Sequence, residues 1–389
     1  MSINYGGRIF SAYGFGCIMG CFGWFRHNVY SGSLFFAHNL NFDGSIILSN
    51  IDDCVTVSNA VLRGGNIYGL DFMVGNIIIK LKCSAKFFPG ELGSIATRLN
   101  LPPKLGYDHK FNFDDIQDSL FRSNAIKYCE RDAEIVSKLI SKIHYSIEPV
   151  ASGWYDRVLS ISGLAMFIFT KNFNNLNINL RLNSDIDKLI RPSYYGGRCE
   201  VFGNPLKSDS IHHYDFTLMY TNRLLDDFPI DTGYILKDPI DINQCGFFFV
   251  EVSSNLNIPI LPHRCKNTKK LLFPNGFFSG LYWHEELELF KKFGGIILKI
   301  HWAYVFKKVG PVFKKFAELC CKLREVDKIS RSIWKLIPNS FIGRLGLKSV
   351  SDKTIVIKDD IYNPLDYNVI SDIKIKKKKL TWPISIKIF

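Results

Sequence analysis

Short apolar runs alternate with polar breaks along the first half of the chain. Segments 35–40, 45–50 and 73–82 are rich in Phe, Ile and other strand-forming residues, and Gly, Asn and Asp separate them, which predicts strands. Apolar residues recur at helical spacing over 91–101 and 123–143, so helices are expected there. The pattern therefore predicts strands and helices mixed in one region.

The second half of the chain follows a similar pattern after a polar interruption. Residues 172–190 are rich in Asn, which is typical of a linker. Strands are expected at 211–220 and 246–253, and helices at 284–294 and 311–335. The predicted fold class is mixed α/β, with a domain boundary between residues 145 and 190.

Residues 9–25 carry no charge and raise the question of a membrane segment. The run is at the lower length limit for a spanning helix, and four glycines interrupt it. Strand–turn–strand is the favoured interpretation, and a membrane helix is the alternative.

The ten cysteines show no disulfide rhythm. Cys17 and Cys21 are the closest to a ligand pair, but no second Cys/His pair follows at zinc spacing. Reduced and mostly buried thiols are expected.

The net charge of +13 gives information about binding partners. An excess of Lys and Arg of this size favours an anionic partner, nucleic acid before a membrane surface, although solubility alone is the structural alternative. Arg324, Lys328, Arg331 and Lys335 are spaced by four, three and four residues, which predicts one basic stripe on a helix. Such a stripe suits a polyphosphate, and a solvated helix face explains the spacing equally well.

Two motifs in the first half carry candidate metal chemistry. Asp43 follows an apolar segment at an expected strand-to-helix turn, where a carboxylate can hold a hard cation. Tyr128 and Asp132 are four residues apart and share one helix face, where the Tyr can orient a water and the Asp can bind a metal. The structural alternatives are an ordinary turn for Asp43 and a surface pair for the other two.

The third motif begins as a glycine loop. Tyr194, Gly196 and Gly197 precede Arg198, and a backbone without side chains can approach a phosphate closely. Asp215 then lies on an expected strand. Tyr220, five positions later, would point to the opposite face of a regular strand. A bend after Asp215 is needed to bring both residues to one site.

The fourth motif is KLIPNSFIG, from Lys335 to Gly343. Asn339, Ser340 and Gly343 are expected to continue the helix of the basic stripe, and the glycine would let a flat base pair lie against the backbone. Pro338 removes a backbone donor, so a kink is expected there.

Taken in order, these motifs resemble those of family B DNA polymerases, above all the protein-primed type of linear mitochondrial plasmids and some phages. HNLNFDG and YCERD resemble the second and third exonuclease motifs, YYGG the Tyr-x-Gly-Gly motif, YDFTLMYT motif A, and KLIPNSFIG motif B. PILPHR and KLLFPNGFFSGLYWHEEL also resemble this branch. Motif A departs from the family at Leu218, Met219 and Thr221, and motif B at Ile342, which replaces a Tyr.

The resemblance implies a fold and a domain order. Residues 1–150 would form a partial ribonuclease-H-like 3′–5′ exonuclease domain and 151–190 a linker. Residues 191–389 would form an incomplete polymerase palm and fingers, with the thumb missing.

The resemblance also implies roles for individual residues. The catalytic residues would be Asp43, Tyr128, Asp132, Asp215, Tyr220 and Lys335, and Mg²⁺ would be bound by Asp43, Asp132 and Asp215. Incoming dNTP would be bound by Tyr220, Arg331, Lys335, Asn339, Ser340 and Gly343. DNA would be contacted by Lys110, Tyr194, Gly196, Gly197 and Arg198, where Lys110 in KFNF resembles a Lys-x-x-hydrophobic exonuclease motif.

Two motifs of the family are not found in the sequence. No Tyr-x-Asp-Thr-Asp follows Gly343, and the only adjacent acidic pair there is Asp359-Asp360; no Asp or Glu occurs within residues 1–42. Both two-metal sites would therefore be incomplete, and the chain is expected to be short at both ends.

The expected function is DNA-directed DNA polymerisation from a DNA or protein primer, with DNA, dNTPs and a terminal priming protein as partners. No membrane partner is expected, and the expected location is the mitochondrion. The alternative is an inactive remnant that only binds DNA or nucleotide, and an unrelated structural protein is a third possibility.

Overall fold

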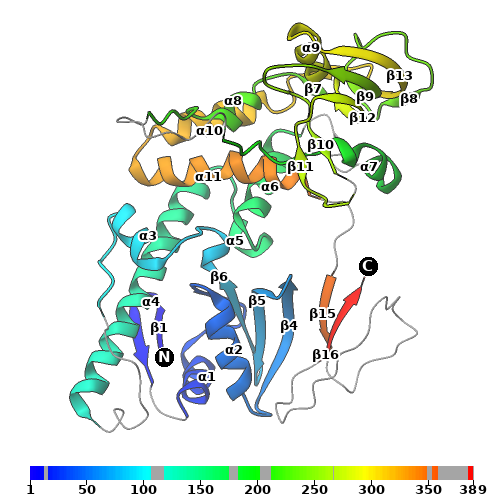
Figure 1. Ribbon diagram of the computed structural model, residues 1–389. Helices are drawn as coiled ribbons and strands as arrows, with labels where there is room; N and C mark the ends of the chain where they lie inside the picture. Colours follow the sequence, from blue (N-terminus) through cyan, green and yellow to red (C-terminus); the bar gives the residue numbers. More distant parts are fainter. Residues whose placement is uncertain are drawn as a thin grey trace. The chain divides into compact units, whose positions relative to one another are not determined.

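The computed structural model describes residues 1–12, 16–106, 118–174, 183–201, 212–265 and 267–347, together with the backbone of 353–357 and 384–388. The chain mixes α-helices and β-sheets, as expected (Figure 1). It divides into two compact units. The first unit comprises Met1–Lys171, Lys322–Phe341 and Val350–Phe389, and the second comprises Asn172–Cys321 and Ile342–Ser349.

A six-stranded sheet in the order β16-β15-β4-β5-β6-β3 forms the centre of the first unit. Its pairs are antiparallel except for β3 and β6, which are parallel. Gly64, Gly65 and Gly75 adopt positive φ in the turns that join β4 to β5 and β5 to β6. The strands are β3 (Ser33–Ala37), β4 (Val55–Arg63), β5 (Asn66–Val74), β6 (Ile77–Cys83), β15 (Lys353–Ile357) and β16 (Ile384–Ile388).

Helices α1 (Cys17–Asn28) and α2 (Leu40–Asn50) lie against β5 and bury their apolar faces in a common core with the sheet (Figure 1). The long helix α4 (Ser119–Ile147) begins at Asp118, whose side chain accepts hydrogen bonds from the amides of Leu120 and Phe121. The remaining elements of this unit are β1 (Ser2–Tyr5), β2 (Arg8–Ser11), η1 (Ser84–Lys86), α3 (Leu92–Arg98), α5 (Trp154–Arg157) and α6 (Ile161–Asn172).

An antiparallel sheet in the order β12-β9-β13-β8 forms the centre of the second unit. Alternate residues of β9, among them Phe248, Val250 and Val252, are fully buried, which is the period-two pattern of a half-buried strand. The elements are α7 (Ser184–Ile190), η3 (Arg191–Ser193), α8 (Met219–Arg223), β7 (Phe228–Pro229), β8 (Tyr234–Leu236), β9 (Gly246–Ser254), β10 (His263–Arg264), β11 (Leu271–Leu272), β12 (Gly276–Trp283), α9 (His284–Lys292), β13 (Ile296–Val305) and β14 (Val309–Gly310). Helices α10 (Lys314–Arg324) and α11 (Lys328–Leu345) contribute residues to both units.

Most long periodic segments have the predicted structure. The segments expected as helices at 91–101 and 284–294 contain α3 and α9, and the segment at 123–143 lies within α4. The strand expected at 73–82 covers the end of β5 and most of β6, and the one at 246–253 lies within β9. The strand expected at 35–40 overlaps the end of β3.

Two expected strands near the N-terminus are wrong. Residues 45–50 belong to α2, because Leu40, Gly44 and Ile47 are spaced by four and three residues and bury one helical face. Residues 9–25, expected as strand–turn–strand, contain the end of β2 and most of α1, whose buried Ile18, Cys21 and Phe25 also have helical spacing. None of the described helices is long and apolar enough to cross a membrane.

The cysteines are less buried than expected. None of the ten forms a disulfide, but only Cys21, Cys83 and Cys320 are buried, and Cys54 and Cys199 are exposed. Burial raises the pKa of Cys21 to about 11, so this thiol stays protonated at neutral pH.

Candidate nucleotide and nucleic-acid site

A cavity of about 750 Å³ in the first unit brings together the residues of the two exonuclease-like motifs. Asp43 lies in the first turn of α2, and Tyr128 and Asp132 lie on one face of α4. All three side chains line this cavity. Residues that are far apart in the sequence therefore face one space.

The carboxylates of Asp43 and Asp132 lie in surroundings that disfavour their ionised forms. Burial raises the pKa of Asp43, and the negative charge of Asp132 raises it further, although the hydrogen bond to the Asp43 backbone lowers it. Burial also raises the pKa of Asp132, against the opposing effect of Lys104. Among the described residues the buried Oδ1 of Asp132 has no hydrogen-bond partner. A cation beside these two groups would lower their electrostatic cost.

Lys104 is a site residue that the sequence analysis missed. Its Nζ lies 3.3 Å from Asp132 Oδ2 and 5.1 Å from the centre of the Tyr128 ring. Burial works against its charge, yet a hydrogen bond with Tyr128 and the charge of Asp132 raise the pKa of Lys104 overall. KLGY, which begins at Lys104, has the same Lys-x-x-hydrophobic spacing as KFNF and was the available signal. Lys110 itself lies outside the described residues.

His38 also lines this cavity, and its ring holds the turn that leads into α2. Its Nε2 donates to the carbonyl of Gly90 at 2.8 Å, and its Nδ1 lies 2.9 Å from Ser84 Oγ. Because both ring nitrogens are engaged, His38 positions the segment from which Asp43 projects.

The resemblance implies Mg²⁺, and the described residues do not fit a two-metal site. Such a site needs several carboxylates that share two ions about 3.5–4 Å apart. Within the described ranges, no group of three or more His, Cys, Asp or Glu side chains lies close enough to hold a metal. Asp43 and Asp132 would supply two ligands at most, and Asp359-Asp360 lie outside the described residues.

Asp215 does not lie on the strand that was expected. Residues 212–216 have no regular secondary structure, and none of the described strands pairs with them. A strand needs a neighbour to satisfy its backbone groups, so apolar composition alone does not form one. The expected bend is present: Leu218 has a left-handed φ of 57°, and α8 with Tyr220 starts directly after it. Asp215 and Tyr220 are both exposed.

The Tyr194–Gly197 loop follows η3 in the second unit. Tyr194, Gly196 and Gly197 are exposed. A Cβ at Gly196 or Gly197 would meet no atom within 4 Å, and neither glycine adopts positive φ. The described part of the chain therefore gives no internal reason for the two glycines. Open space above a bare backbone is what close approach of a phosphate requires.

Arg198, which was expected to contact DNA, makes three contacts within the second unit. Its guanidinium pairs with Glu200, donates to the carbonyl of Pro259 at 2.6 Å and lies 4.1 Å from the centre of the Phe273 ring. These contacts fasten the loop to its own unit.

The basic stripe is divided between two helices, which corrects the expected single helix. Helix α10 ends at Arg324, and α11 starts at Lys328. Asp327 caps α11, since its Oδ1 accepts hydrogen bonds from the amides of Ile329 at 2.7 Å and Ser330 at 2.9 Å. Three of the four cations, Lys328, Arg331 and Lys335, remain on one helix.

Helix α11 has one exposed face and one buried face. Lys328, Arg331, Lys335, Asn339 and Gly343 are all exposed and follow each other at intervals of three or four residues, which places them along one side. The helix continues through Pro338, so Asn339, Ser340 and Gly343 extend it as expected. The buried face is formed by Ser330, Ile333, Trp334, Ile337, Pro338 and Phe341.

The buried face of α11 is fixed to two helices of the first unit. Trp334 Nε1 donates to Ser146 Oγ of α4 at 2.9 Å, and the rings of Phe341 and Phe169 of α6 are 5.1 Å apart. These contacts set the rotation of α11, and the Lys335 side therefore faces outward.

A known family of proteins has a sequence profile that matches most of this chain. The profile described as DNA polymerase type B, organellar and viral, matches residues 112–384. A probable DNA polymerase of Ascobolus immersus is 30% identical over 251 residues, which cover 61% of this chain and 20% of that protein. A probable DNA polymerase of Podospora anserina is 26% identical over 275 residues, which cover 67% of this chain and 22% of that protein. The chain spans about a fifth of the length of these relatives.

The fold is similar to solved structures of Phi29 DNA polymerase. The complex with primer-template DNA and incoming nucleotide substrates has a TM-score of 0.64 at 14% identity, covering 91% of this chain and 65% of that chain. The post-translocation binary complex with primer-template DNA has a TM-score of 0.62 at 16% identity, covering 84% and 62%. Because the family profile matches well over half of the sequence, the chain belongs to the organellar and viral, protein-primed type of family B DNA polymerases.

Proposed function

We propose that this chain works in DNA synthesis as part of a family B polymerase that transfers dNTPs to a DNA or protein primer. The observation that carries the proposal is the exposed face of α11. Three cations, Asn339 and Gly343 lie on this face. A row of cations followed by a small polar end suits a triphosphate with a base attached.

The proposed roles follow this arrangement. Lys335, with Arg331, binds the triphosphate of the incoming dNTP, and Asn339, Ser340 and Gly343 lie along the base. In the second unit, Tyr194, Gly196 and Gly197 contact template phosphates through the open backbone, and Tyr220 supports the deoxyribose. Asp215 is the metal-binding carboxylate of the polymerase site, and it requires further carboxylates as partners.

We propose that the cavity with Asp43, Tyr128 and Asp132 belongs to a ribonuclease-H-like exonuclease domain. Residues 191–389 are proposed to form the palm and fingers. Lys104 would hold the Asp132 carboxylate in place there. We further propose a terminal protein as the primer and a mitochondrial location. The terminal protein is supported by the protein-primed type of the family. The mitochondrial location is supported by the organellar family profile and by the fungal relatives of the chain.

Binding measurements with a matched pair of lysine variants test the proposal. Affinity for a labelled primer-template is measured over a salt series, followed by affinity for dNTP on the protein–DNA complex. Lys335→Ala removes a cation of the proposed face, and Lys322→Ala removes an exposed cation of α10. We expect DNA binding to weaken steeply with salt, since each phosphate contact releases a counterion.

The two lysine variants separate nucleotide binding from general DNA contact. Lys335→Ala should weaken dNTP binding about tenfold or more, which is the scale of one lost charge-assisted hydrogen bond, and DNA binding less. Lys322→Ala should leave dNTP binding unchanged. Equal losses of DNA and dNTP binding in Lys335→Ala would make the stripe a general DNA contact. No DNA binding at low salt would remove the proposal altogether.

A further inference from the structure

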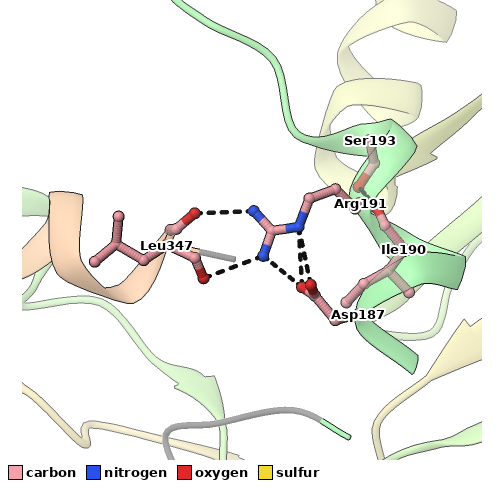
Figure 2. Close-up of polar contacts among 6 residues, drawn as sticks. Asp187, Ile190, Arg191, Ser193 and Leu347 are labelled. Carbon is pink, nitrogen blue, oxygen red and sulfur yellow. Dashed lines mark hydrogen bonds and ion pairs between the residues drawn. The ribbon is translucent and has the colours of Figure 1, made fainter. Parts of the chain in front are cut away.

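Arg191 occupies a junction that none of the motifs includes. It starts η3, directly after α7 and three residues before Tyr194. Figure 2 shows its guanidinium between the carboxylate of Asp187 on one side and the backbone at Leu347 on the other. All these residues belong to the second unit. Arg191 therefore joins two segments that are more than 150 residues apart in the sequence.

The guanidinium is used on three sides. Nε lies 3.0 Å and 3.2 Å from the two oxygens of Asp187, and Nη2 pairs with the same carboxylate. Nη1 donates to the carbonyl of Gly346 at 2.9 Å and Nη2 to that of Leu347 at 3.3 Å. The planar fork of arginine can make these bonds at once, and a lysine ammonium cannot.

The two carbonyls lie directly beyond the C-terminus of α11. The amides of Gly346 and Leu347 still donate to the carbonyls of Ile342 and Arg344, so this turn continues the helix end. Helix C-termini carry partial negative charge, and a cation at this place is stabilising. Asp187 is largely buried, with 13% of its side chain exposed, and it holds the cation in place.

Tyr194 completes the junction. Its amide donates to the carbonyl of Arg191 at 2.9 Å, and the centre of its ring lies 5.6 Å from the Arg191 guanidinium carbon. A Cβ at Gly346 would come within 2.5 Å of the Tyr194 hydroxyl. The absence of a side chain at Gly346 thus lets the first residue of the Tyr194–Gly197 loop lie against the end of α11.

We propose that Arg191 is a positioning residue that fastens the C-terminal end of α11 to the start of the Tyr194–Gly197 loop. The end of α11 that belongs to the second unit, from Ile342 onward, and the loop proposed to contact the template are thereby held at a fixed spacing. The significance of this spacing rests on the proposed function, whereas the clamp itself is tested without any ligand.

Hydrogen exchange of the full chain, followed by mass spectrometry, tests the clamp. The amides of Tyr194, Gly346 and Leu347 are hydrogen-bonded and report on both joined segments. Arg191→Ala should raise exchange at both segments by roughly tenfold or more, the scale expected when hydrogen bonds to a charged group are lost. Exchange in β9, β12 and β13 should stay unchanged. Arg191→Lys should retain most of the defect.

Asp185→Asn is the matched control. It breaks an exposed ion pair with Lys188 on α7 and should not affect either joined segment. If exchange in Arg191→Ala rose only within α7, or if Arg191→Lys restored protection at Gly346 and Leu347, Arg191 would merely stabilise its own helix and the clamp would be disproved.

Two further measurements keep the outcomes separate. If Arg191→Ala does not fold, Gly346→Ala perturbs the junction from the other side by displacing Tyr194, and it should loosen the same amides. DNA and dNTP affinities of the variants are then compared with those of the wild type. Loss of both in Arg191→Ala supports the role in positioning. A wild type that binds neither ligand would refute the proposed function, whereas the exchange result would still decide whether the clamp exists.

Discussion

The division of α11 into a structural face and a binding face can be tested with two residues that are neighbours on the helix. Ile337 is fully buried, whereas Lys335 is exposed. Ile337→Ala removes three carbon atoms, each worth about 0.8 kcal/mol of transfer free energy, which gives roughly 2.4 kcal/mol before any cavity is counted. With a cavity term, the free energy of unfolding should fall by about 2–5 kcal/mol.

Lys335→Ala should behave differently. The side chain is solvent-exposed, so the free energy of unfolding should change by less than about 0.5 kcal/mol. Both variants are assayed by urea denaturation followed by circular dichroism, and by hydrogen exchange of α11 amides, because a chain with two units need not unfold in one step. Similar destabilisation by the two variants would refute the assignment of faces. A larger loss in Lys335→Ala would do so more strongly.

Two electrostatic predictions follow from the same structure. Because burial raises the pKa of Asp43, its ionised form opposes folding, so Asp43→Asn should raise the free energy of unfolding at pH 7. This gain in stability should vanish at pH values below 3.8, the ordinary pKa of an aspartate, because Asp43 is then protonated in both the folded and the unfolded chain. A gain that persists there would contradict the electrostatic cause. Asp327→Ala removes the N-cap of α11 and should lower the free energy of unfolding by about 1 kcal/mol. Hydrogen bonds to Ser330 lower the pKa of Asp327, so in the wild type the cap should be lost only as pH falls below 3.8, and denaturation over a pH series checks both variants.

The long periodic elements could be predicted because their spacing agrees with their packing. In α4 and β9, the apolar positions that define the period are those that are buried. The exposed face of α11 was also predictable, since Lys328, Arg331 and Lys335 keep helical spacing. The break between α10 and α11 was not predicted, because Asp327 is an ordinary polar residue in the sequence. Only the structure shows that its side chain accepts hydrogen bonds from the amides of Ile329 and Ser330 and so caps α11.

The errors have a common physical origin in tertiary context. Residues 45–50 have strand-forming composition, but the window is too short to show that Leu40, Gly44 and Ile47 share a helical face. The segment around Asp215 has apolar neighbours but no strand partner among the described residues. Lys104 was overlooked because a Lys-x-x-hydrophobic spacing occurs twice within a few residues. Only the fold shows that Lys104 pairs with Asp132.

The central claim is that this chain belongs to a polymerase family while its described carboxylates do not form a two-metal site. Primer extension by the isolated chain tests this claim most directly. A labelled primer-template is incubated with dNTPs and Mg²⁺ or Mn²⁺, using the wild type beside Asp215→Asn. We expect little or no extension from either protein, because one exposed aspartate cannot bridge two ions and losing such a ligand costs several kcal/mol of transition-state stabilisation. Robust synthesis that Asp215→Asn abolishes would contradict this. It would show that another carboxylate of the chain, Asp359 or Asp360 first, completes the site.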